Sequence, residues 1–278
     1  MGIVGRTALA VTLAAIVGLG SAIAAAGEIS DGVVKIGVLT DMSGQFSHES
    51  GEGAVTAVRM AIEDFGGKVL GKPIELVVAD HQNKPDIASG IARKWFDVEN
   101  VDMIANLINS SIALGVTQLA RDKDRIAIVT GSGASRLTGD ACTPNSVHYA
   151  YDTYSLAKGT ATAMMKTGGT SWYFLTADYA FGHALEADTS AVVKSLGGEV
   201  LGSARYPVET SDQSSFLLQA QASHAKVVGW PAPERCLSMP SRRRRSSASS
   251  AADKPSQAFS SGSPTSRASG LKRRRAWS

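Results

Sequence analysis

From residue 33 onward, short runs of β-branched apolar residues alternate with longer segments in which apolar residues recur at helical spacing. The apolar runs cover residues 33–40, 74–80, 102–105 and 126–130. In the segment after the first run, apolar side chains stand at i, i+3, i+4 and i+7, namely Val58, Ala61, Ile62 and Phe65. A stripe of this kind predicts a helix that packs against a sheet, and Gly66-Gly67 then ends that helix.

Two more helical segments, over residues 85–98 and 111–121, complete four strand-helix repeats between residues 33 and 130. Strands that alternate with helices are typical of a parallel sheet covered by helices. The sequence therefore predicts an α/β fold, with residues 27–147 as a first lobe.

A second series follows a short crossing at residues 147–153. It contains predicted helices at 154–167, 182–196 and 214–222, and predicted strands at 171–176, 199–206 and 226–229. This series predicts a second Rossmann-like lobe over residues 148–229. The pattern stops after Gly229, so we expect the second lobe to be incomplete.

The last segment, residues 230–278, differs from the rest of the chain in composition. It contains 13 Ser, neither Val nor Ile, and two arginine-rich clusters. Its formal charge is +9, whereas residues 1–229 carry −6. Such a segment buries too little apolar surface to order itself, and we expect a basic tail without order.

The amino terminus has the pattern of a secretory signal peptide. Arg6 precedes an apolar run at residues 8–19, and small residues end at Ala26. The run is too short for a comfortable membrane span, so we expect cleavage near Ala26 and release into the periplasm. Cys142 and Cys236 are distant in the sequence, and we expect two unpaired thiols.

Small polar residues follow each predicted strand of the first lobe. They lie at residues 41–44, 80–83, 109–111 and 130–134. Taken alone, a serine before a helix is an ordinary N-cap, and Gly-Ser-Gly is an ordinary turn. Because parallel strands end at one sheet edge, the four loops together predict a polar rim that holds a carboxylate. Ser110 or Ser111 is expected to cap the following helix.

Three segments resemble the branched-chain amino acid binding proteins of bacterial ABC importers: VVKIGVLTDMSG, ADHQNKPDIA and TADYAFGHAL. The resemblance covers about residues 28–229 and implies a type I periplasmic-binding-protein fold, in which two lobes close on a solute like a hinged clamp. It also implies an inner-membrane ABC permease complex as partner, a monomeric protein, and an amino acid, amide or small carboxylate as solute.

Carried over residue by residue, the resemblance implies a ligand site made by both lobes. The implied ligand-binding residues are Ser110, Ser111, Gly131, Ser132 and Ala134, then Phe46 and His48, and from the second lobe Tyr151, Asp178, Tyr179 and Phe181. By charge, the serines suit a carboxylate, the aromatic rings suit the body of the solute, and Asp178 suits an ammonium group. His48, His81 and His183 are too scattered for a metal set, and helix-start or surface roles are expected.

The chain departs from the family after Gly229. Members of the family are longer and continue with further second-lobe elements and a return to the first lobe. The change at Trp230 into Ser- and Arg-rich sequence suggests a shifted reading frame as a hypothesis. A single-base change that restores α/β periodicity in the nucleotide sequence would support it, and an intact frame would count against it.

Other functions remain as alternatives. Gly131-Ser132-Gly133 resembles the start of a dinucleotide or nucleophile motif, but Arg136 replaces the third glycine of the former, and Thr130 and Ala134 replace the glycines of the latter. We therefore expect that the protein has no enzymatic activity and binds neither a cofactor nor a metal. The basic runs of the tail lack interleaved aromatics, so no nucleic-acid binding is expected. A ligand sensor of the same fold and a non-functional truncated paralogue stay open.

Overall fold

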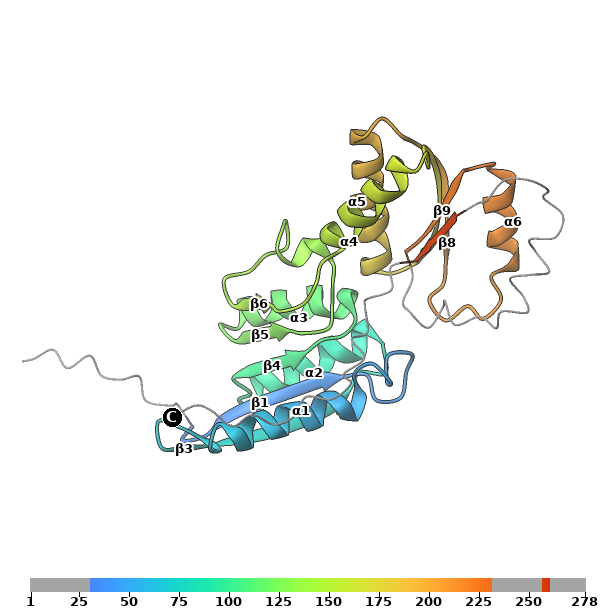
Figure 1. Ribbon diagram of the computed structural model, residues 1–278. Coiled ribbons are helices and arrows are strands. Elements are labelled where there is room, and N and C mark those ends of the chain that lie inside the picture. The colour runs from blue at the N-terminus through green and yellow to red at the C-terminus, as the bar shows by residue number, and fades with distance from the viewer. Residues whose placement is uncertain (1–30, 232–256, 261–278) are drawn as a thin grey trace, which may run out of the picture.

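The computed structural model describes residues 31–231 and 257–260. Two mainly parallel sheets, one in each lobe, organise these residues (Figure 1). The first sheet has the strand order β2-β3-β1-β4-β5-β6. Its strands are β1 Val34–Thr40, β2 Lys68–Val69, β3 Lys72–Asp80, β4 Met103–Asn106, β5 Ile126–Val129 and β6 Ser146–His148. The short strand β2 pairs antiparallel with β3, and the other neighbouring pairs of this sheet are parallel.

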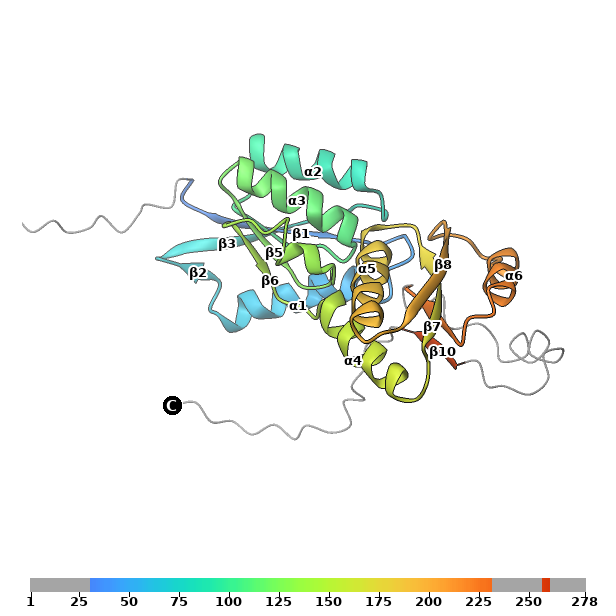
Figure 2. The ribbon, with the colours of Figure 1, turned by 90° about the horizontal axis from the view of Figure 1, so that it is seen from above.

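Three helices cover the two faces of this sheet. They are α1 Gly51–Asp64, α2 Pro85–Asp97 and α3 Ser110–Asp122. Figure 2 shows α2 and α3 on one side of the sheet and α1 on the other. The chain therefore changes face between β1 and β4, which are neighbours in the sheet. In open α/β sheets, ligands bind outside the carboxyl ends of the strands at such a switch point.

The main core of the first lobe lies between the sheet and the helices α2 and α3. Its buried members include Leu39, Ala92, Trp95, Ile104, Ile112, Val116 and Val129. The Trp95 ring lies directly on Gly37 of β1, where an added Cβ would come within 2.6 Å of it. Glycine at this position of the strand thus leaves room for the Trp95 ring.

The apolar stripe predicted for α1 packs less completely than expected. Val55, near the start of the helix, is buried, whereas Ala61 is exposed and Phe65 is 67% exposed. Phe65 follows the last helical residue, so it leaves the face that its spacing predicted. The buried residues of the helix, Gly51 and Val55, both lie in its first half.

The second lobe is built on a four-stranded parallel sheet in the order β10-β9-β7-β8. Its strands are β7 Ser171–Ala177, β8 Glu199–Tyr206, β9 Val227–Trp230 and β10 Gln257–Ser260, and its helices are α4 Thr153–Lys166, α5 Ala180–Ser195 and α6 Ser214–Ala222. Figure 1 shows α6 on one side of this sheet and α4 with α5 on the other. Tyr206 and Phe216 meet on the α6 side, and Trp172 packs with Val193 on the other side. The predicted α/β fold with two parallel sheets is confirmed.

Two features of the carboxyl-terminal part differ from expectation. Trp230 is the last residue of β9 rather than the first of an unordered tail, and residues 257–260 form β10 beside β9. An edge strand can add to a sheet through backbone hydrogen bonds alone, so composition does not exclude it. The rest of the segment lies outside the described residues, as do residues 1–26, so the proposed domain division stays a prediction.

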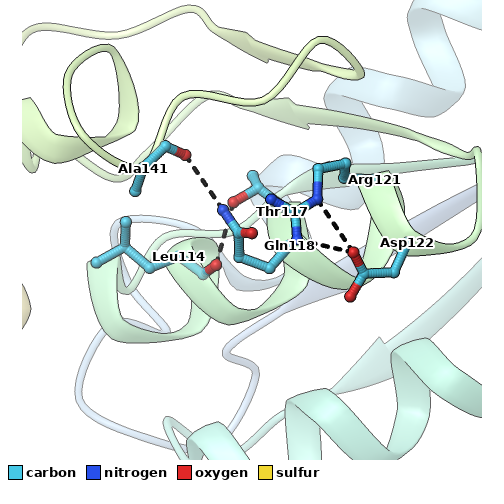
Figure 3. A network of polar contacts seen from close by, with 6 residues as sticks. All are labelled: Leu114, Thr117, Gln118, Arg121, Asp122 and Ala141. Carbon is cyan, nitrogen blue, oxygen red and sulfur yellow. Dashed lines mark hydrogen bonds and ion pairs between the residues drawn. The ribbon is translucent and has the colours of Figure 1, made fainter.

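The outer part of α3 is fastened to the loop that leads to β6 (Figure 3). Gln118 Nε2 donates to the Ala141 carbonyl at 3.4 Å, and Thr117 Oγ1 donates to the Leu114 carbonyl at 3.2 Å. Arg121 pairs with Asp122 at 2.8 Å on the exposed side. The last two contacts lie within α3, so among these three it is the Gln118–Ala141 bond that ties the helix to the loop.

Cys142 is a free, exposed thiol, and Cys236 lies outside the described residues, so the expected pair of free thiols is tested only at Cys142. Among residues 31–231 and 257–260, no helix is long and apolar enough to cross a bilayer.

Candidate functional site

The polar loops of the first lobe meet at one sheet edge, as the parallel register requires. In the sheet register, Thr40 at the end of β1 pairs with Asp80 of β3, and Leu39 pairs with Asn106 of β4. Asn106 in turn pairs with Val129 at the end of β5. The loops that follow β1, β4 and β5 therefore lie side by side at the switch point.

The N-cap of α3 is Asn109, not a serine. Asn109 Oδ1 accepts hydrogen bonds from Ser111 N at 2.7 Å and from Ile112 N at 3.3 Å. Ser110 and Ser111 are already the first helical residues. The sequence expectation of a serine cap is therefore wrong by one or two positions, which leaves the serine hydroxyls available for other partners.

The two serines of α3 point to different partners. Ser110 is buried, and its Oγ accepts a hydrogen bond from Ala134 N at 3.3 Å. Ser132 is also buried and donates to the carbonyl of Leu107. Both hydroxyls thus tie the loop after β5 to the loop after β4 within the first lobe.

Ser111 instead reaches the second lobe. Its Oγ accepts a hydrogen bond of 3.1 Å from the backbone N–H of Ala180, the first residue of α5. The amino-terminal ends of α3 and α5 therefore come together at one hydroxyl. The Ser111 hydroxyl accepts in this bond and keeps its own proton to donate, and both helix ends present the positive end of a helix dipole, which favours an anion.

Hydrogen bonds among buried polar side chains hold this edge of the sheet together. The hydroxyls of Thr40 and Ser50 lie 2.6 Å apart, and Ser50 Oγ donates to Asn106 Oδ1 at 2.7 Å. Asn106 and Leu107 both have positive φ, at 85° and 56°. A left-handed leucine is strained, and such strain is typical of functional sites held by their surroundings.

Four aromatic side chains form a cluster that joins the two lobes. Phe46 and Tyr179 have ring centroids 6.3 Å apart, and Tyr179 and Phe181 are 6.0 Å apart. Tyr151 meets Phe181 edge to face at 6.4 Å. Gly133 makes room for this cluster, because a Cβ there would approach Tyr151 to 2.8 Å and Phe181 to 3.0 Å.

The remaining predicted site residues take other positions. His48 is exposed in the turn after Phe46 and has no ring contact with the aromatic cluster. Asp178 is exposed and pairs with His183 Nε2 at 2.7 Å, which places His183 in the first turn of α5 as expected. Gly131 packs against Ile108. His81 is fully buried, so the expectation of a surface or helix-start role is wrong for it.

An open pocket of about 590 Å³ lies beside the Ser111–Ala180 contact. Its lining includes Ser135, Arg136, His183, Asp188 and Arg205 in addition to those two residues and Tyr179. Sequence reasoning placed Asn109 in a polar loop without giving it a role, and it missed Ser135 and Arg205. Ser135 stands one position beyond the loop at residues 130–134, whereas Arg205 lies inside a predicted strand and carries no local signal.

The histidines and acids of the described residues form no group of three or more that could hold a metal ion. The donors at the lobe interface are instead hydroxyls, backbone N–H groups and arginines. These groups suit an oxyanion or a carboxylate.

Comparison with known proteins decides the family, since the periplasmic binding protein model matches residues 33–232. The chain belongs to the periplasmic binding protein family. Periplasmic binding proteins of solved structure share its fold. One from Burkholderia mallei is 54% identical with a TM-score of 0.70, and covers 72% of this chain and 54% of its own.

Two further relatives agree with this assignment. A branched chain amino acid ABC transporter periplasmic ligand-binding protein from Burkholderia xenovorans is 41% identical, with a TM-score of 0.58, over 71% of this chain and 53% of that chain. The Leu/Ile/Val-binding protein homolog 6 of Brucella abortus is 24% identical over 70% of this chain and 50% of its own length. The resemblance to the branched-chain amino acid binding proteins is thus confirmed, and the chain spans about half the length of these relatives.

Proposed function

We propose that this periplasmic binding protein is the extracytoplasmic capture component of an ABC importer, and that it holds a small carboxylate between its two lobes. The observation that carries the proposal is the hydrogen bond from Ala180 N–H to Ser111 Oγ. It brings two helix amino termini from different lobes to one point, where a carboxylate would meet the Ser111 hydroxyl and the positive ends of both helix dipoles.

In the proposed site, the Ser111 hydroxyl donates to the carboxylate, and the positive end of the α3 dipole stabilises its charge. Ser110, Ser132 and Ala134 fix the loops around it, and Gly131 packs behind them against Ile108. The aromatic cluster of Phe46, Tyr151, Tyr179 and Phe181 contacts the body of the solute. Asp178 receives an ammonium group, if one is present, in exchange for His183.

Leucine-like amino acids, short amides and aromatic carboxylates fit this description, because each joins a polar group to an apolar body. The proposed partners are the solute and the inner-membrane permease complex. The proposed location is the periplasm, and the protein is proposed to act as a monomer.

The test is a thermal-shift and calorimetric screen of the full chain against L-leucine, isobutyramide, benzoate and 4-hydroxybenzoate. A ligand that binds only the folded state stabilises it by RT ln(1 + c/Kd), where c is the free ligand concentration, so the melting temperature rises with that concentration. A concentration-dependent rise for at least one carboxylate is expected. No shift with any of these at millimolar concentration would contradict the proposal.

A further inference from the structure

The amino terminus of α3 is held by a chain of three hydrogen bonds that starts at a buried histidine. The His81 ring follows β3 and is fully buried. Its Nδ1 accepts a hydrogen bond of 3.0 Å from the backbone N–H of Asn83. Asn83 Oδ1 then accepts a hydrogen bond of 2.7 Å from Asn109 Nδ2.

Asn109 uses its other side-chain atom to cap α3. Since Asn109 Oδ1 accepts from Ser111 N at 2.7 Å, the orientation of its amide is set from both ends. A side-chain amide with a partner on each atom cannot rotate without losing one of them. The position of Ser111 is therefore linked to His81, which does not touch the lobe interface through any of these contacts.

The chemistry of the ring makes this link specific. An Nδ1 that accepts a hydrogen bond carries no proton, so the neutral ring has its proton on Nε2. His81 Nε2 is buried and has no hydrogen-bond partner among the described residues. A buried N–H without a partner is costly. An apolar side chain would avoid that cost, but it could not accept from Asn83.

The surroundings favour the uncharged ring. Burial lowers the pKa of His81, and the carboxylates of Asp41 and Asp80 oppose this effect. Both carboxylates already accept backbone hydrogen bonds. Asp41 accepts from Gly44 N and Phe46 N, and Asp80 accepts from Met42 N of the same first loop and from Gln82 N of its own turn. Neither makes a hydrogen bond to the free Nε2.

We propose that His81 is a positioning residue for the solute site, which acts through Asn83 and Asn109 on the amino terminus of α3. This inference rests on the proposed function, because it assumes that the solute carboxylate binds at that terminus. It adds a dependence of solute affinity on a residue outside the site. It also predicts that the link fails when the ring takes up a second proton, since imidazolium has no acceptor.

The cleanest variant is Asn83→Gly in the full chain. Asn83 has a φ of 56°, which glycine adopts freely, so the change removes Oδ1 without straining the turn. Gln82→Gly is the matched control. Gln82 has a φ of 52° in the same turn, and its side chain is contacted by Lys84 instead of Asn109.

The first measurement needs no solute. Amide hydrogen exchange at Ser111 and Ile112 should become faster in Asn83→Gly and His81→Leu, and should stay at the wild-type rate in Gln82→Gly. His81→Asn should restore the rate in part, because its Oδ1 can accept where Nδ1 does. Nitrogen NMR should show His81 with Nδ1 unprotonated. Unchanged exchange at both amides in Asn83→Gly, or an Nδ1-protonated ring, would overturn the proposal.

The second measurement is solute affinity by calorimetry with L-leucine and benzoate as probes. Asn83→Gly should bind about three- to tenfold more weakly, as expected for one lost hydrogen bond, with Gln82→Gly unchanged. Between about pH 7.5 and pH 5, wild-type affinity should fall more steeply than that of His81→Asn. Equal affinities in Asn83→Gly and wild type would overturn the proposal. If wild type binds neither probe, the proposed function fails, whereas the exchange rates still decide whether His81 positions α3.

Discussion

Ser111 Oγ of α3 accepts a hydrogen bond of 3.1 Å from Ala180 N–H of α5, and this bond joins the two lobes. Its neighbour Ser110 is buried and bonds Ala134 within the first lobe. Two adjacent serines thus serve different ends, because successive residues on a helix point about 100° apart. This difference can be tested directly.

Ser111→Ala is expected to weaken the binding of a carboxylate solute by about tenfold, since it removes one hydroxyl from the proposed site. It also removes the acceptor of Ala180 N–H, but Ala180 is only partly buried, so water can replace the hydroxyl and the melting temperature should change little. Ser110→Ala should instead lower the free energy of unfolding by about 1 kcal/mol, because it leaves Ala134 N–H buried without its acceptor. Its effect on affinity should be small. Calorimetric titration and urea unfolding measure the two effects.

The exposed Ser195, whose Oγ bonds the Val192 carbonyl at the far end of α5, provides the control. Ser195→Ala should leave both affinity and stability unchanged. Equal losses of affinity in Ser110→Ala and Ser111→Ala would argue against a special role for Ser111.

Gly133→Ala is expected to disturb the contact between the loop after β5 and the second lobe. The added methyl group would approach Tyr151 to 2.8 Å and Phe181 to 3.0 Å, so the rings must move. Overpacking of this kind costs about 1–3 kcal/mol. Gly159→Ala in α4 is the matched change, because nothing lies within 4 Å of its Cβ. It should stabilise by about 0.5–1 kcal/mol through helix propensity, and thermal unfolding of both variants checks the opposite signs.

Stability is expected to fall as the pH drops below about 6.5, the usual pKa of histidine. Burial lowers the pKa of His81 in the folded state, so the unfolded chain binds the proton first. The state that binds more protons gains as the pH falls, and the free energy of unfolding decreases with it. Urea unfolding between about pH 8 and pH 5 measures the slope.

His48 is exposed and provides the control for this pH dependence. His48→Asn should keep the wild-type slope, and His81→Asn should flatten it. The carboxyl of Asp80 titrates in a lower range. Burial raises its pKa, but hydrogen bonds from Ser43, Met42 and Gln82 bring it below its usual 3.8, so it contributes nothing to the slope above about pH 5. A slope that persists in His81→Asn would contradict the assignment.

Phe46→Leu is expected to weaken aromatic carboxylates more than L-leucine, because the Phe46 ring contacts Tyr179 across the lobe interface. An aromatic pair contributes about 0.5–1.5 kcal/mol beyond its buried area, so the loss for benzoate should be about two- to tenfold. Phe65→Leu changes an exposed phenylalanine and should alter neither affinity. The ratio of the two dissociation constants in each variant is the measurement.

The sequence by itself determined the order of strands and helices and the sheet edge on which the site would lie. Runs such as residues 74–80 and the helical spacing of residues 182–196 depend on local periodicity, which long-range packing changes little. The parallel arrangement follows from their alternation. It places residues 109–111 and 130–134 side by side whatever the details of the core.

Only the tertiary structure decided which of these residues face the interface. Asn109 rather than a serine caps α3, and Ser111 rather than Ser110 reaches Ala180. His81 is buried, and β10 joins the second sheet. The Ser111–Ala180 bond joins residues 69 positions apart, and the Asn109 side chain is oriented by Asn83, 26 positions away. Local spacing fixes the face of an element but leaves open what packs against it.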